Sequence, residues 1–148
     1  MRKIRFILPL AAACQMFAGG FWLQLGNPEA SAEARKANAA IYIKAVGCHD
    51  PAAAQVTASA VGTVNGRRET IALKVTPLSE PGTFAITQQW PKNGHWVIQL
   101  TGKTGDLFTN TLVNAGPEGV DRLHAMSEMK PFHAVVPMTC PRSVRPCR

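Results

Sequence analysis

The middle of the chain alternates between apolar and polar positions with a period of two residues. Two such runs lie within residues 81–101 and are separated by the turn-forming residues 90–94. Apolar and aromatic side chains share one face of the two runs: Phe84, Ile86, Trp96, Ile98 and Leu100. This period and these residue types are typical of half-buried strands. The pattern predicts an antiparallel β unit with Trp96 in the core.

The same alternation recurs on both sides of this unit. Residues 41–46, 55–64, 70–76 and 107–113 predict further strands, and Asn65-Gly66 is a strong hairpin signal. No long amphipathic helical pattern separates these runs, which disfavours a parallel α/β fold. We therefore predict an all-β fold. Residues 40–115 would form a single immunoglobulin-like or transthyretin-like β-sandwich of six to seven antiparallel strands.

The pattern changes after Ala115. Val120, Leu123 and Met126 recur at a spacing of three, which predicts a short helix within residues 117–130. A further short strand is predicted at residues 131–138. Residues 116–148 are thus expected to form a short irregular or helical C-terminal extension.

The N-terminus has the pattern of an export signal. A positive segment containing Arg2, Lys3 and Arg5 precedes a mostly apolar stretch, residues 6–25, and a small-x-small site at Ala30-Ser31-Ala32. We expect residues 1–32 to be a signal peptide that is cut before Glu33, followed by a flexible leader at residues 33–39. The mature chain would then be periplasmic or secreted and would not span a membrane.

Two other interpretations of the N-terminus remain open. A retained membrane anchor is disfavoured because Pro9, Gln15 and Gly19-Gly20 interrupt the apolar stretch. A lipoprotein acylated at Cys14 ranks low, because a large apolar residue three positions before the cysteine is missing and the apolar stretch continues beyond it.

Three cysteines would follow such a leader: Cys48, Cys140 and Cys147. Export places them in an oxidising compartment, and their odd number allows at most one intramolecular disulfide. A bond from Cys48 to a C-terminal cysteine would staple the extension to the sandwich. We favour Cys140 as its partner, although spacing does not fix the connectivity.

The charge of the chain does not change the prediction of an exported β-sandwich. The chain carries 16 basic and 9 acidic residues, with a net charge of +7. Basic residues gather at the C-terminal end, at Arg142, Arg145 and Arg148. No interleaved aromatics or nucleic-acid-binding module accompanies them, so we expect no nucleic-acid partner.

The sequence contains no recognisable catalytic motif. It has no nucleophile elbow, zinc-protease helix motif, phosphate loop or dinucleotide fingerprint. Cys48-His49-Asp50 is not a triad, because neighbouring side chains on an extended chain point in opposite directions. We expect a protein that is not an enzyme and has no cofactor.

One set of side chains near the C-terminus has the chemistry of a copper site: His124, Met126, Met129, His133 and Met138. Thioether and imidazole ligands together suit Cu(I). The alternative is that the methionines fill the core and the histidines lie on the surface.

Trp90 and His95 are candidates for surface contact with a ligand or partner. Trp90 follows two glutamines at the start of a turn, where it could either pack under the loop or be exposed. His95 lies on the outward face of its predicted strand.

The phrase Pro81-Gly82-Thr83-Phe84, followed by Asn93-Gly94-His95-Trp96-Val97-Ile98, resembles the exported β-sandwiches of the YtkA-like and copper-resistance periplasmic type. The resemblance covers residues 40–113 and implies an exported single domain, sometimes associated with metal. Copper-resistance proteins place a ligand histidine at the mature N-terminus. Glu33-Ala34 has none, so no ligand is carried over by position.

These observations favour an exported, non-catalytic β-sandwich that serves as an accessory or interaction domain of the bacterial cell envelope. Its partner would be an envelope protein or ligand of unknown identity. The alternative is a periplasmic copper-binding protein that uses the C-terminal methionines and histidines.

Overall fold

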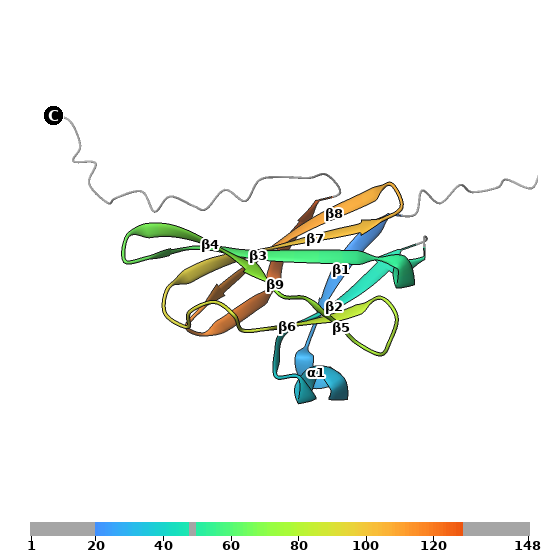
Figure 1. Cartoon of the computed structure of the whole chain (residues 1–148), viewed down its shortest axis with the longest axis horizontal. Helices are drawn as coiled ribbons and strands as arrows, with labels where there is room; N and C mark the ends of the chain where they lie inside the picture. The colour runs from blue at the N-terminus through green and yellow to red at the C-terminus, as the bar shows by residue number, and fades with distance from the viewer. Residues whose placement is uncertain (1–19, 48–49, 129–148) are drawn as a thin grey trace, which may run out of the picture.

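The computed structural model describes residues 20–47 and 50–128, which form two antiparallel β-sheets packed as a sandwich (Figure 1). The first sheet has the order β1 (Phe21–Gly26), β2 (Ala39–Gly47), β6 (Thr83–Thr87), β5 (Thr76–Pro77). The second has the order β4 (Arg67–Leu73), β3 (Gln55–Val64), β7 (His95–Thr104), β8 (Leu107–Gly116), β9 (Gly119–Glu128). The predicted all-β sandwich is confirmed, with two strands, β1 and β9, outside the predicted domain.

The core lies between the two sheets and is built from alternate strand residues. Ile41 and Ile43 of β2 face Ile98 and Leu100 of β7, and all four are fully buried. Trp96 is only 1 % exposed, so its predicted place in the core is confirmed. The period of two therefore gives each sheet one inner face for this shared core.

The β3–β4 hairpin forms where Asn65-Gly66 predicts it. Both residues have positive φ, 50° and 76°, as a tight two-residue hairpin turn requires. The strands on either side then pair in continuous register from Val64–Arg67 to Ala58–Leu73.

The two runs of residues 81–101 do not pair with each other, and this prediction was wrong. β6 pairs with β2 and β5, whereas β7 pairs with β3 and β8 in the other sheet. The connection between them crosses from one sheet to the other. Two hydrogen bonds hold this connection against the segment after β4: the Lys74 amide donates to Gln89 Oε1 at 2.8 Å, and Gln89 Nε2 donates to the Lys74 carbonyl oxygen at 2.9 Å.

Residues 119–128 form strand β9 rather than the expected helix. A two-residue turn at Pro117-Glu118 returns the chain along β8. The register then shifts between Asp121 and Met126, where four residues of β9 lie opposite Val113. The bulge turns Leu123 outward to 93 % exposure, so the apolar spacing of three marks an irregular strand rather than a helical face.

Residues 21–26 form strand β1 of the sandwich, within the stretch that the sequence predicts as a leader, residues 1–32; the leader and its removal stay predictions. β1 pairs with β2 over six positions, and Phe21 and Leu23 are 2 % and 3 % exposed. A 3-10 turn (Pro28–Ala30) and helix α1 (Ala32–Lys36) connect β1 to β2 (Figure 1). The leader at residues 33–39 is thus helix and the start of β2.

Several predictions concern residues outside the described part of the chain: the strand at residues 131–138 and the disulfide candidates Cys48, Cys140 and Cys147. They stay predictions.

A second 3-10 turn, Pro51–Ala53, precedes β3. Within the described residues, no helix is long and apolar enough to cross a membrane.

Candidate binding cleft

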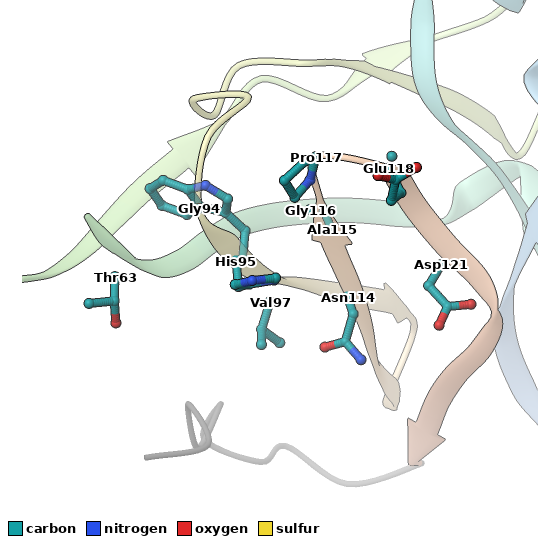
Figure 2. Close-up of a pocket in the computed structure, with 12 residues that line it drawn as sticks. Thr63, Gly94, His95, Val97, Asn114, Ala115, Gly116, Pro117, Glu118 and Asp121 are labelled. Atoms are coloured by element: carbon teal, nitrogen blue, oxygen red, sulfur yellow. The ribbon is translucent and has the colours of Figure 1, made fainter. Parts of the chain in front are cut away.

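A cleft of about 560 Å³ opens on the second sheet, where β7 begins and β8 turns into β9. Its volume falls within the range of typical small-ligand sites. Its walls are mainly carbon, with polar groups at a few positions. The turn residues Pro117 and Glu118 close one end (Figure 2).

Strand register brings the floor of the cleft together. Thr63 of β3 pairs with His95 of β7, and Val97 of β7 pairs with Asn114 of β8, which pairs with Asp121 of β9. Since Trp96 and Ala115 face the core, these neighbours point to the opposite face of the sheet. Figure 2 shows the side chains of His95, Val97 and Asn114 on that same side.

Glycine leaves the cleft open beside its histidine. A Cβ on Gly116 would lie 3.5 Å from His95 Nδ1, so any larger side chain there would cover the imidazole. Gly94 has φ +105°, a conformation that other residues adopt only with strain. Gly94 therefore allows the turn before β7 to take the conformation that places it in the lining of the cleft.

The cleft carries negative charge in a chain that is positive overall. Glu118 and Asp121 line it together with His95, and no lysine or arginine is among its lining residues. Both carboxylate oxygens of Asp121 lie 2.9 Å from His124 Nδ1. This hydrogen bond lowers the pKa of Asp121 below its ordinary value of 3.8.

The indole nitrogen of Trp96 is buried without a hydrogen-bond partner among the described residues. A Cβ on Gly94 would lie 3.5 Å from this nitrogen, which places it beneath the turn that borders the cleft. An unpaired buried donor of this kind costs about 1–3 kcal/mol. The Trp96 ring is therefore packed in the core although its N–H group lacks a hydrogen-bond partner there.

The two predicted surface-contact residues separate in the structure. His95 is exposed and lines the cleft. Trp90 is 5 % exposed and belongs to the core, so of its two alternatives the structure agrees with packing under the loop and not with surface contact. The connection from β6 to β7 carries Trp90 inward as it passes between the sheets.

Two of the five copper-ligand candidates lie on β9. His124 is exposed and bonded to Asp121, and Met126 is 65 % exposed rather than buried. Met129, His133 and Met138 lie outside the described residues. In the part of the chain that is described, no three His, Cys, Asp or Glu side chains gather as a metal site would require.

Sequence reasoning missed Asn114, Glu118 and Asp121 as cleft residues. The missed signal was Gly116-Pro117-Glu118-Gly119, a turn sequence that joins two strands and brings β9 beside β8. The expected helix at residues 117–130 obscured this hairpin.

The chain is an antiparallel two-sheet β-sandwich with an acidic cleft on the outer face of its larger sheet. No family model, curated protein or solved structure matches the chain. The resemblance to YtkA-like and copper-resistance sandwiches therefore stays a prediction.

Proposed function

We propose that the protein is an exported, non-catalytic interaction domain of the bacterial cell envelope, and that its cleft binds a basic side chain of a partner protein. The observation that carries the proposal is the acidic cleft itself. Val97 and Pro117 supply apolar surface for an aliphatic stem, and Glu118 and Asp121 supply negative charge. Lysine and arginine combine such a stem with a terminal positive charge.

Two features of the cleft support binding rather than catalysis. Its lining includes neither serine nor cysteine, the usual nucleophiles of covalent catalysis. The Asp121 carboxylate is bonded to His124, which lies outside the lining, rather than to the His95 imidazole within it. The lining thus has no serine or cysteine, and its Asp121 carboxylate is not paired with its His95 imidazole, which favours ligand binding over covalent catalysis.

Titration of the ¹⁵N-labelled full chain with a short lysine- and arginine-containing peptide tests the proposal. We expect saturable amide shifts centred on His95, Asn114 and Asp121, and no such shifts with a peptide of the same length in which norleucine replaces the basic residues. Equal shifts with both peptides, or shifts away from the cleft, would contradict a cleft that recognises the positive charge of the ligand.

A matched pair of variants locates the binding. Asn114→Trp fills the cleft from an exposed strand position, whereas Thr57→Trp adds the same bulk to an exposed position on β3 outside the cleft. We expect Asn114→Trp to abolish binding of the basic peptide and Thr57→Trp to leave it unchanged. Unchanged binding by both variants would place the site elsewhere.

Copper binding is the second candidate, and the Asp121–His124 pair favours it. Metal-binding histidines commonly donate one ring nitrogen to a carboxylate and present the other to the metal. His124 has this arrangement, and the exposed Met126 follows two residues later. Titration with Cu(I) should give stoichiometric binding that His124→Ala and Met126→Leu each weaken; no stoichiometric binding would exclude this candidate.

A further inference from the structure

We infer that the export leader is cut upstream of β1, so that the first residue of the mature chain lies between Cys14 and Phe21. The inference depends on the proposed export of the chain. It replaces the cut before Glu33 that Ala30-Ser31-Ala32 predicts.

β1 is held by both sheets. It pairs with β2 from Phe21–Gly47 to Gly26–Tyr42, and it packs against β8 and β9 of the opposite sheet. Its residues alternate as a strand does: Phe21 and Leu23 are buried, while Trp22 is 43 % exposed. This alternation is that of a structural strand, whereas a signal peptide needs only a continuous apolar stretch.

Two distant glycines are fitted to β1. A Cβ on Gly102 would lie 2.9 Å from Leu23 Cδ2 and 3.0 Å from Phe21 Cε1. A Cβ on Gly47 would lie 2.6 Å from the Gly20 carbonyl oxygen. Thr109 Cγ2 is the third close neighbour of the Gly102 position, at 3.0 Å, and the Phe21 Cα lies 3.2 Å from the Gly47 position. Most of the close contacts at both glycines therefore come from the segment that a cut before Glu33 would remove.

The expected cut would also divide a folded element. The Ser31 hydroxyl accepts a hydrogen bond from the Ala34 amide at 3.2 Å and caps α1, whose first residues are Ala32 and Glu33. The Glu33 carboxylate in turn accepts hydrogen bonds from the Ser79 amide and hydroxyl, at 2.9 and 3.1 Å. The small-x-small sequence thus forms a helix N-terminus.

The sequence upstream of β1 still contains every part of a leader. Arg2, Lys3 and Arg5 provide the positive segment, and residues 6–17 provide a mostly apolar segment of ordinary length before Ala18-Gly19-Gly20. Ala11-Ala12-Ala13 and Ala18-Gly19-Gly20 are two further small-x-small sites. Hydrolysis of one peptide bond after either site, by the signal peptidase of the cell and with one water consumed, leaves β1 intact.

This assignment also removes one objection to acylation of Cys14. The apolar sequence beyond that cysteine is explained by β1, so it does not extend the leader. A cut after Ala13 would make Cys14 the first residue.

Expression of the full chain in a Gram-negative host, followed by intact-mass measurement and N-terminal sequencing of the envelope fraction, tests the inference. A first residue between Cys14 and Phe21 supports it, including Cys14 with the added mass of a lipid. Glu33 as first residue overturns the inference and leaves export standing. An uncut chain in the cytoplasm overturns both.

Two variants distinguish a cut before Glu33 from a cut upstream of β1. Ala32→Asp places an acidic residue just before the rejected cut, where the first turn of α1 favours negative charge and the fold is preserved. We expect its processing to match that of the unchanged chain, and loss of processing would overturn the inference. Ala13→Asp combined with Gly20→Asp should abolish processing, and a normal yield of cut chain would contradict an upstream site.

Discussion

Gly62 and Trp96 show how closely single residues are fitted in this core. They lie opposite each other in the β3–β7 pair, and a Cβ on Gly62 would lie 2.5 and 2.6 Å from two atoms of the indole ring. The His95 carbonyl oxygen would be 2.9 Å from the same Cβ. The largest side chain of the core therefore depends on the smallest residue of the neighbouring strand.

We expect Gly62→Ala to destabilise the fold by about 1–3 kcal/mol, because the added methyl group overpacks the core against the ring and the backbone. Urea unfolding followed by circular dichroism measures the change. Gly116→Ala is the matched control in the same sheet, since its Cβ would meet only ordinary contacts, at 3.5 Å or more. An equal loss in both variants would contradict the role of ring packing.

The Asp121–His124 pair gives a pH dependence whose sign is fixed. The bond from His124 lowers the pKa of Asp121 in the folded chain below 3.8. The unfolded chain therefore takes up the proton first, and the stability from this carboxylate, present above pH 3.8, is lost as pH falls below it. We expect the stability difference between the parent chain and Asp121→Asn to shrink over that acidic range in chemical unfolding.

The same substitution in a His124→Ala background provides the control. Without the imidazole the carboxylate loses the main cause of its lowered pKa, so the acid-dependent difference should be much smaller. If the acid-dependent stability difference were as large without His124, another neighbour of Asp121 would be the cause of its lowered pKa.

At the scale of elements, β1 makes the clearest prediction. A chain that begins at Gly20 should fold, whereas a chain that begins at Glu33 should lose cooperative unfolding, because it lacks one of the two partners of β2 and two buried core residues. Thermal unfolding by circular dichroism distinguishes the two.

A point variant tests the same element with the chain complete. Phe21→Ala should cost about 3–5 kcal/mol, as loss of a buried phenylalanine does. Gln24→Ala, at an exposed position of β1, should stay within about 0.5 kcal/mol of the parent chain. A small effect of Phe21→Ala would show that β1 contributes little to the core.

Periodicity predicts the strands of this protein better than it predicts their partners. The faces of β3 and β7 and the Asn65-Gly66 hairpin follow from local sequence. The pairing of β6 does not, because a connection of several residues can either close a hairpin or cross between sheets. The crossing places Trp90 in the core between the sheets. Its burial depends on residues from both sheets and therefore cannot be predicted from the local sequence.

The candidate cleft was predictable only in part, for a related reason. His95 was identified from its alternation on β7, but Asp121 and Glu118 reach the cleft only because the β8–β9 turn returns the chain. At the N-terminus, a strand rich in Phe and Leu has the composition of a leader. Its pairing with β2 and its alternating burial against the core distinguish the two.

For the whole molecule, we expect unfolding in a single cooperative step. Trp90 and Trp96 belong to one core shared by both sheets, so neither sheet can keep its packing without the other. Tryptophan fluorescence, which reports these two core residues together with the partly exposed Trp22 of β1, and far-ultraviolet circular dichroism, which reports the strands, should give the same urea midpoint. Separate midpoints would show that one sheet unfolds independently.

The contact of β1 with β8 and β9 joins the beginning of the described chain to its end. During synthesis β1 emerges from the ribosome before β8 and β9, so its contacts with the opposite sheet can form only after residues 107–128 have been made. The described sandwich therefore cannot be complete before its C-terminal strand is available. If the chain is exported as proposed, we expect these contacts to form after β9 has crossed the membrane.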